Sequence, residues 1–557
     1  MKHLVAFLAL LAALQVLSQV QQEWVVRYNN YHSQGWDEPV GLVTDNLGNI
    51  YVAGSGAGNN IIDSWEYEYV TIKYNSNGVQ QWLKRFNRDS NQTDMAINLT
   101  IDNLGNVYVT GTSSEYYTDP GNIVILKYNS SGTLLWNVVY EYSYAWNVPR
   151  AIHTDNYGNC YVSCQLFNTN SKYDYGLLKY NSDGIRQWTR TYSLTDSSYD
   201  YAVSSCIDMT GNIYITGYSN TINYYDIVTM KYNSSGVMQW SQIYNSSYDS
   251  TDYSYSVAVD SSGNVYVGGF SQNSTGWDII VLKYNSNGVL RWVKNFPGPK
   301  YINWPSWSEF RDKTVKLCLD KSKYLYVASC TKENLSINSD IAVLKYDTTG
   351  LMLWSRTFGS TSGNSDYAKC MTVDTTGNVY VSCYAKDDYL TLKYSNLGDL
   401  LWQIYYNGAN RGDYPTGICL DYSGNIIITG LSESNNTFYD FATIKYSQPI
   451  GIQPISTEIP NKFSLSQNYP NPFNPTTKIR FNIPPLEGDR GRISQLIIYD
   501  VLGMEIKTLV NEQLKPGTYE VEFDPEKSGQ AGLPSGVYFY KLFTNGFSET
   551  KKMVLLK

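Results

Sequence analysis

Histidine is almost missing from this chain. Only three occur in 557 residues, and His3 falls in the N-terminal segment, which leaves His32 and His153. His153 lies in a strand-like segment, at a position where similar segments carry Val, Thr, Ala or Cys, so we interpret it as a core residue. A Ser-His-Asp triad or a histidine metal site would therefore depend on His32 alone. We expect no enzymatic activity, no catalytic residues, no metal site and no cofactor.

Clusters of positive charge and long apolar runs are missing as well. The 50 Asp and Glu residues outnumber the 42 Lys and Arg residues, for a net charge of −8, and no basic stripe suited to nucleic acid occurs. The apolar run Leu4–Leu17 follows Lys2 and is too short for a membrane span, which is typical of a signal peptide. We predict a signal peptide over residues 1–18 with cleavage before Gln19. We expect no lipid anchor and no transmembrane segment.

Cysteine does not follow a disulfide pattern, although an exported chain with eight cysteines invites one. Cys206, Cys318 and Cys419 share one position of the repeat described below, two residues before its Asp. Cys164 and Cys383 share another position, where other copies carry Gly. Because Val, Thr and Ala replace Cys in other copies, we interpret these residues as small core side chains.

Tyrosine is abundant, with 52 residues, and a repeat extends from residue 22 to 446. The pair Lys-Tyr begins at residues 73, 127, 179, 231, 283, 345, 393 and 445, which are 48 to 62 residues apart. The motif Asp-x-x-Gly-Asn begins at Asp45, Asp102, Asp155, Asp208, Asp260, Asp374 and Asp421, with a degenerate copy at Asp320. A Trp precedes Tyr or Phe by four residues at Trp24, Trp82, Trp136, Trp188, Trp240, Trp292, Trp354 and Trp402.

Each repeat contains four short alternating runs, such as "SYSVAVD", "NVYVGGF", "DIIVLKYN" and "GVLRWVKNF" in the fifth copy. Turns that end in Gly join these runs in pairs, as in β-hairpins. We predict an all-β fold in which residues 19–447 form an eight-bladed β-propeller. The N-terminal Trp24 strand should complete the last blade beside Tyr446. Seven blades is the alternative, if residues 297–345 do not form a blade.

The repeats resemble the bacterial β-propeller repeat family, whose units read roughly A-V-D-x-x-G-N-V-Y-V-T-G, then D-x-x-x-x-K-Y-N-x-x-G and W. The resemblance covers about three quarters of the chain. It implies the propeller architecture and little about activity, because this fold carries both enzymes and binding platforms.

The remaining residues lack the repeat. We predict a linker over residues 448–461, spaced by Pro, and a small immunoglobulin-like β-sandwich over residues 462–557. Alternating segments such as "QLIIYDVLGMEIKTL" and "SGVYFYKLFTNG" support strands separated by Gly and Pro turns. The charged segment "PLEGDRGR" at residues 485–492 is expected to lengthen a hairpin.

This module resembles the type A C-terminal sorting domain of type IX secretion cargo, found in Bacteroidetes and related phyla. The matching segments are "NYPNPFNP" at 468–475, "IYDVLG" at 498–503, "SGVYFYKL" at 535–542 and "KKMVLLK" at 551–557. The sorting-signal residues that the resemblance implies are Asn468, Tyr469, Pro470, Asn471, Pro472, Lys551, Lys552 and Lys557. It implies export to the periplasm, handling by the type IX machinery, and a final place outside the cell or on its surface.

Carboxylates recur at the predicted starts of the first and third strands of each repeat. The first set is Asp37, Asp94, Asn147, Asp200, Asp252, Asp312, Asp366 and Asp413, and Tyr follows at Tyr201, Tyr253, Tyr367 and Tyr414. The second set is Glu68, Asn122, Asp174, Asp226, Asp278, Asp340, Asp388 and Asp440. Both sets should lie at one end of the propeller, opposite the Asp-x-x-Gly-Asn turns.

Two interpretations of these carboxylates stay open. Each Asp can accept hydrogen bonds from loop N–H groups, or the acidic, Tyr-lined end can bind a glycan or protein ligand, with or without calcium. The Asp-x-x-Gly-Asn turns themselves lack the further oxygen ligands of a calcium loop. We therefore favour a secreted, non-enzymatic binding or scaffold module. The alternatives are a polysaccharide-degrading enzyme that uses the Asp and Tyr residues, and a structural surface-layer component.

Overall fold

The computed structural model of this protein is built of β-strands, and the residues that it describes form no helix. It describes residues 20–30, 36–58, 66–88, 93–114, 121–141, 147–168, 172–196, 198–220, 224–247, 250–274, 276–298, 314–331, 339–360, 365–408, 412–421, 423–433, 439–448, 454–456, 459–485, 492–514, 516–525, 533–544 and 546–556. The chain divides into two compact units, of which the larger spans Trp24–Tyr422 and Ile426–Lys445 and the smaller contains Tyr446–Lys557. The all-β prediction is confirmed.

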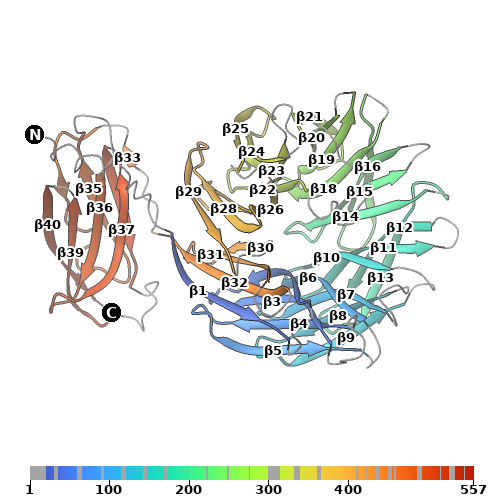
Figure 1. Cartoon of the computed structure of the whole chain (residues 1–557), viewed down its shortest axis with the longest axis horizontal. Coiled ribbons are helices and arrows are strands. Elements are labelled where there is room, and N and C mark those ends of the chain that lie inside the picture. Colours follow the sequence, from blue (N-terminus) through green and yellow to red (C-terminus); the bar gives the residue numbers. More distant parts are fainter. Residues whose placement is uncertain are drawn as a thin grey trace, which may run out of the picture. The chain divides into compact units, whose positions relative to one another are not determined.

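The described strands of the larger unit form four-stranded antiparallel sheets, here called blades 1 to 8 (Figure 1). Blade 1 holds β2 (Glu38–Thr44), β3 (Ile50–Ala57), β4 (Tyr67–Tyr74) and β5 (Gln80–Phe86). Blade 2 holds β6 (Thr93–Ile101), β7 (Val107–Ser114), β8 (Asn122–Tyr128) and β9 (Leu134–Tyr140). Blade 3 holds β10 (Val148–Thr154), β11 (Cys160–Asn168), β12 (Lys172–Tyr180) and β13 (Arg186–Tyr192). Blade 4 holds β14 (Asp200–Ile207), β15 (Ile213–Asn220), β16 (Tyr225–Tyr232) and β17 (Met238–Tyr244).

The later blades follow the same order until the last one. Blade 5 holds β18 (Asp252–Val259), β19 (Val265–Asn273), β20 (Gly276–Tyr284) and β21 (Leu290–Pro297). Blade 6 holds β22 (Lys316–Leu319), β23 (Leu325–Thr331), β24 (Asp340–Tyr346) and β25 (Met352–Phe358). Blade 7 holds β26 (Tyr367–Val373), β27 (Val379–Ala385), β28 (Asp388–Tyr394) and β29 (Leu400–Tyr406). Blade 8 holds β30 (Asp413–Leu420), β31 (Ile426–Glu433), β32 (Tyr439–Ser447) and the N-terminal strand β1 (Gln21–Tyr28), which pairs with β32.

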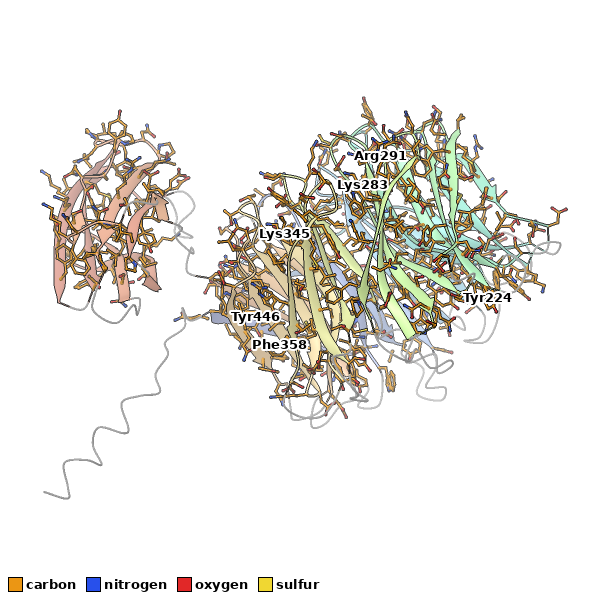
Figure 2. All side chains as sticks on the ribbon, turned by 90° about the horizontal axis from the view of Figure 1, so that it is seen from above. Tyr224, Lys283, Arg291, Lys345, Phe358 and Tyr446 are labelled. Atoms are coloured by element: carbon orange, nitrogen blue, oxygen red, sulfur yellow. The ribbon has the colours of Figure 1, made fainter. Side chains whose placement is uncertain are left out.

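The blades are joined by a repeated contact between a Lys, a Trp and the turn of the next blade. In blade 1, Lys73 Nζ and Trp82 Nε1 both donate to Ser130 O of blade 2, each over 3.0 Å. The Trp ring also packs against a Gly of that turn, where a Cβ on Gly132 would lie 2.8 Å from Trp82. Figure 2 shows the equivalent Lys283 and Lys345 at one side of neighbouring blades, with Phe358 at the other.

The same contact joins blade 8 to blade 1. Trp24 Nε1 and Lys445 Nζ donate to Ser76 O over 3.2 and 3.1 Å. In addition, the N–H of Asp37 donates to Tyr439 O over 2.7 Å. We call this junction, in which β1 and β32 of blade 8 face blade 1, the seam.

The degenerate repeat keeps the shape of its turn without Gly. Lys323 occupies the Gly position with a φ of 66°, and its N–H donates to Asp320 O over 3.0 Å. The Asp320 Oδ1 atom accepts the N–H of Tyr324 over 2.9 Å, as the Asp of the other turns does. Residues 316–358 thus form the four strands of blade 6 despite the altered motif.

The smaller unit is a sandwich of two sheets. One sheet orders β33 (Pro454–Ser456), β38 (Gly517–Phe523), β35 (Thr477–Ile483) and β34 (Ser464–Leu465). The other orders β37 (Glu505–Leu514), β36 (Arg492–Tyr499), β39 (Gly536–Thr544) and β40 (Phe547–Leu555). Side chains of both sheets, such as Phe481 and Tyr540, share one core.

Two expectations for this region need correction. Residues 454–456 of the expected linker form β33, which pairs with β38, so the sheet begins earlier than residue 462. Residues 486–491 of the charged insertion lie outside the described residues, but the strands on either side, β35 and β36, belong to different sheets and form no hairpin with each other. A Pro-spaced segment and a charged segment carry no signal for the sheet to which their neighbouring strands belong.

The structure also bears on the expectations for the cysteines, for a membrane span and for the signal peptide. All eight cysteines are described and form no disulfide. Burial raises the pKa of the Cys160 thiol to about 12, as for a side chain in a core. Among the described residues, no helix has the length and apolar character needed to cross a bilayer. The expected signal peptide at residues 1–18 lies outside the described residues.

Candidate functional site

The Asp-x-x-Gly-Asn turns are closed by their own hydrogen bonds. In blade 5, Asp260 Oδ1 accepts the N–H groups of Ser262 and Asn264 over 2.8 and 3.0 Å. Its Oδ2 accepts Asn264 Nδ2 and Tyr266 Oη over 2.8 and 3.2 Å. Gly263 has a φ of 76°, the left-handed conformation that glycine adopts without strain. The carboxylate is committed to the turn, so we look for a ligand site at the other end of the blades.

The opposite end, where the first and third strands of each blade begin, is here called the Asp end. The predicted residues of the first set that the structure describes are Asp37, Asp94, Asn147, Asp200, Asp252, Asp366 and Asp413, and each is at most 1% exposed. Asp312 lies outside the described residues. These side chains therefore point away from solvent.

The buried Asp residues hold the connections between blades. Asp252 Oδ2 accepts the N–H of Ser246, and Asp413 Oδ2 accepts that of Gly408, both over 2.7 Å. Asn30 and Arg88 donate in the same way to Asp37 and Asp94, both over 2.7 Å. Each donor follows the fourth strand of the preceding blade, so the carboxylate fixes the point at which the chain enters its own blade. This geometry matches the first of the two interpretations of these residues.

Burial also changes the acidity of this set. Loss of solvation raises the pKa of Asp37 to about 7 and that of Asp252 to about 6, against the lowering effect of their hydrogen bonds. Burial raises the pKa of Asp200, Asp366 and Asp413 in the same direction. The Asp end therefore takes up protons more readily than exposed carboxylates do.

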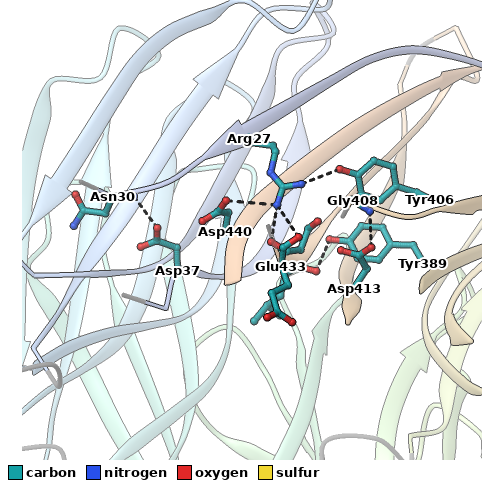
Figure 3. A network of polar contacts seen from close by, with 11 residues as sticks. Arg27, Asn30, Asp37, Tyr389, Tyr406, Gly408, Asp413, Glu433 and Asp440 are labelled. Atoms are coloured by element: carbon teal, nitrogen blue, oxygen red, sulfur yellow. Dashed lines mark hydrogen bonds and ion pairs between the residues drawn. The ribbon is translucent and has the colours of Figure 1, made fainter. Parts of the chain in front are cut away.

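Blade 8 extends this arrangement across all four strands (Figure 3). Asp413 is paired across strands with Ser432. Arg27 of β1 donates to Ser432 O over 2.7 Å and forms an ion pair with Asp440 over 3.5 Å. Arg27 Nη1 also lies 3.4 Å from the Tyr406 hydroxyl. An N-terminal side chain thus completes the polar network at the end of the last blade.

Aromatic side chains cover part of the Asp end over blades 3 to 5. We call this set the blade 3–5 cluster; its members are Tyr173, Tyr199, Tyr201, Tyr218, Tyr225, Tyr253 and Trp277. Tyr201 lies 5.2 Å from Tyr218 and 6.0 Å from Tyr225, between ring centroids. The predicted Tyr253 is only 2% exposed and stacks on Trp277 at 5.7 Å. The other tyrosines of the cluster are partly exposed, so the cluster offers rings to solvent above a buried base.

A second aromatic set extends from blade 7 to the seam. Its members, here called the seam cluster, are Trp36, Tyr367, Tyr384, Tyr414 and Tyr439. Tyr384 and Tyr414 stack with their centroids 4.4 Å apart, and Trp36 contacts Tyr439 at 5.3 Å. Trp36 is 48% exposed. The predicted residues Tyr201 and Tyr253 thus meet in one cluster, and Tyr367 and Tyr414 meet in the other.

Sequence reasoning missed the aromatic partners that complete the two clusters. Tyr218 and Tyr384 stand near the ends of second strands, and Tyr225 and Tyr439 at the starts of third strands. The repeat register places these positions at the Asp end, so an aligned comparison of the copies for aromatic residues could have found them.

The histidines do not build a catalytic set in the described residues. His153 Nε2 lies 2.9 Å from Ser205 Oγ, and burial lowers the pKa of the imidazole to about 4. The ring therefore stays neutral at physiological pH and packs between blades 3 and 4. His32 lies outside the described residues. Among the residues that are described, no group of three His, Cys, Asp or Glu side chains is arranged to hold a metal ion.

In the smaller unit, the predicted sorting motif and the C-terminal strand lie side by side. The N–H of Val554 donates to Asn471 Oδ1, and that of Phe473 donates to Val554 O, over 3.0 and 2.9 Å. Asn468 is 2% exposed, and its Nδ2 donates to Pro470 O and to Thr477 Oγ1 over 3.1 and 2.9 Å.

The other motif residues face outward or flank the strand. Tyr469 is 80% exposed, and Lys551 forms an ion pair with Glu549 over 3.2 Å. Lys552 pairs with Phe539 across β39 and β40, and its carbonyl lies 3.5 Å from Asn471 Nδ2. Pro472 precedes the buried Phe473. Lys557 lies outside the described residues.

Two family models match these two parts of the chain. The secretion system C-terminal sorting domain matches residues 467–556. The β-propeller repeat matches residues 24–62, 81–116 and 239–274. The chain carries β-propeller repeats and a type IX C-terminal sorting domain. The sorting domain indicates export to the cell surface or the extracellular space and implies that the type IX machinery handles the chain.

Wider comparisons place the propeller among distant structures. No curated protein matches the chain. The polysaccharide lyase Uly1 is 9% identical, with 76% of this chain and 91% of that chain covered and a TM-score of 0.41. The WD40 domain of SCAP from fission yeast is 9% identical, with 77% and 97% covered and a TM-score of 0.40. At these TM-scores neither similarity supports a statement about activity.

Proposed function

We propose that the secreted propeller is a non-enzymatic binding module that takes a glycan or protein ligand at its Asp end. The observation that carries this proposal is the blade 3–5 cluster, in which tyrosine rings gather at one end of three neighbouring blades. Tyrosine supplies a large, rigid contact area with a polar hydroxyl at its edge, which suits a recognition surface. The buried Asp residues support this surface from below by fixing the loops around it.

The uniformity of the blades supports a binding role over catalysis. Catalytic acids and bases need distinct environments that separate their pKa values. The described Asp residues of the first set instead share one environment, buried and bonded to connection N–H groups. Burial raises the pKa of both Asp37 and Asp252. Because these Asp residues have the same structural role in each blade, they suit a scaffold whose surface side chains contact the ligand.

The test is a glycan and peptide array probed with the full mature chain and with two variants. Tyr201→Ala removes a ring at the centre of the blade 3–5 cluster. Tyr157→Ala removes a ring that is 85% exposed at the turn end of blade 3 and serves as the matched control. We expect hits that Tyr201→Ala weakens and Tyr157→Ala leaves unchanged.

Two results would reject the proposal. One is an array without hits, together with measurable hydrolase or lyase activity of the same chain. The other is an equal loss of binding in both variants, because it would place the ligand away from the Asp end.

A further inference from the structure

Arg150 is a cation beside the blade 3–5 cluster, at an irregular position of β10. It stands near the start of β10, and the pairing with β11 shifts register between Pro149 and Ala151, so Arg150 is the extra residue of a β-bulge. A bulge re-aims the side chain it carries and is common beside functional sites. The bulges of other blades hold Val40, Ile97, Val203, Tyr255, Lys369 and Thr416 at this position.

The charge of Arg150 has no carboxylate partner among the described residues. Its Nη2 donates to the neutral Gln165 Oε1 over 2.7 Å. Its Nε is shielded from solvent and has no hydrogen-bond partner. Burial lowers the pKa of the guanidinium, and only tyrosines oppose this effect. The residue as a whole is partly exposed, and desolvated charges in proteins are normally paired, so this cation is suited to an anion that arrives with a ligand.

Aromatic rings lie beside Arg150, and a second cation, Lys172, contacts the same cluster at Tyr199. Tyr173, Tyr201 and Tyr218 lie close enough to interact electrostatically with Arg150. The rings of Tyr199 and Tyr201 are nearly parallel, at 14°. The Lys172 ammonium lies 4.0 Å from the centre of the Tyr199 ring. The site therefore combines the flat faces of tyrosine rings with two positively charged side chains, Arg150 and Lys172.

We propose that Arg150 and the neighbouring tyrosines form a site for an acidic saccharide, an inference that rests on the proposed binding function. The planar guanidinium fork matches a carboxylate or sulfate group, while the parallel Tyr199 and Tyr201 rings offer flat surfaces to the sugar faces. A chain with a net charge of −8 repels anions overall. Recognition of an acidic ligand must therefore come from a local cation.

The experiment compares ligands that differ only in charge. A short oligogalacturonate, its neutral methyl ester and a sulfated galacto-oligosaccharide of equal length are titrated into the full mature chain by calorimetry. We expect at least one acidic ligand to bind about tenfold or more tightly than the ester, as a charge-assisted hydrogen bond predicts. Added salt should weaken only the acidic complexes. This salt series tests the site on the wild-type chain even if a variant does not fold.

The matched variants are Arg150→Met and Lys369→Met, which remove one cation from the same bulge position of blades 3 and 7. Arg150→Met should bind the acidic ligand no better than the ester and keep its affinity for the ester. Lys369→Met should bind like the wild type. Equal losses in both variants would overturn the proposal, since they would indicate a general effect of charge.

Other outcomes separate the two proposals. If the ester binds as tightly as the acidic sugar and Tyr201→Ala weakens both, the acidic site is wrong while the binding function stands. If acidic peptides bind and saccharides do not, the ligand class is wrong. If none of the three saccharides binds the wild type, the acidic site is wrong, and the glycan and peptide array decides whether the binding function stands.

Discussion

Alanine at Gly78 should weaken the seam far more than alanine at Gly48 of the same blade. Both glycines have left-handed backbones, with φ of 77° and 76°, and alanine in that conformation costs about 1–2 kcal/mol at either position. Only their surroundings differ. A Cβ at Gly78 would lie 2.7 Å from Trp24 Cδ2, whereas a Cβ at Gly48 would first meet Ser76 Cβ at 3.6 Å.

The extra cost at Gly78 follows from displacement of the Trp24 ring. Crowding a packed contact costs about 1–3 kcal/mol, and a shift of the ring also weakens its hydrogen bond to Ser76 O, worth about 1 kcal/mol. Gly78→Ala should therefore lower the free energy of unfolding by about 2–4 kcal/mol more than Gly48→Ala. Urea unfolding of the full mature chain, monitored by tryptophan fluorescence, measures this difference, provided that the dependence of the unfolding free energy on urea concentration is the same in both variants.

An internal pair of glycines provides the control. Gly132 meets Trp82 at 2.8 Å, while Gly105 has its nearest neighbour, Ser130 Cβ, at 3.6 Å. The difference between Gly132→Ala and Gly105→Ala should match that at the seam. Equal effects of Gly78→Ala and Gly48→Ala would refute the reasoning, because Trp24 would then not be packed on blade 1.

Three further predictions concern single residues. Burial raises the pKa of Asp37 to about 7, so this carboxyl binds a proton more tightly in the folded chain than in the unfolded chain. The free energy of unfolding should therefore fall as the pH rises from about 4 to 7. Measured by urea unfolding, it should depend less on pH in Asp37→Asn. Lys323→Gly should raise stability by up to about 1 kcal/mol by relieving a left-handed lysine, and an unchanged urea midpoint would contradict this. Asn468→Ala should destabilise the sorting domain by about 1–3 kcal/mol, because it leaves buried hydrogen-bond partners unsatisfied. It should also reduce secretion in a type IX host, measured by immunoblot of the medium. Tyr469→Ala, at an exposed position, should leave secretion unchanged.

The strands and turns were predictable because the same local chemistry recurs in every copy. Asp and Gly at fixed offsets define each hairpin, as Asp260 and Gly263 do, and alternation of apolar residues defines the strands on either side. A pattern that recurs in every copy predicts the strands and turns more securely than one copy alone. It also identified blade 6 as the uncertain one, although the backbone there follows the common path with Lys323 in the place of Gly.

The character of the Asp end was harder to predict. Sequence register places Asp252 and Tyr201 at one end of the blades, but it does not say whether a side chain turns toward solvent or toward a neighbouring loop. That choice depends on the connection from the preceding blade, which supplies the N–H of Ser246 to Asp252. Arg150 gave no signal in the sequence, because its surroundings come from two blades, 3 and 4, and from a bulge that no motif marks.

The seam also determines how the propeller should unfold and how it should respond to proteolysis. In an open array of repeats, the terminal units have a single neighbour and unfold first. Here β30 of blade 8 lies against β2 of blade 1 as well as β26 of blade 7, so none of the blades is terminal. The propeller should unfold cooperatively, as one unit. A protease cut after Tyr28 would leave β1 attached only by non-covalent contacts, among them its pairing with β32 and its contact with Ser76, so the seam should be the first junction to loosen.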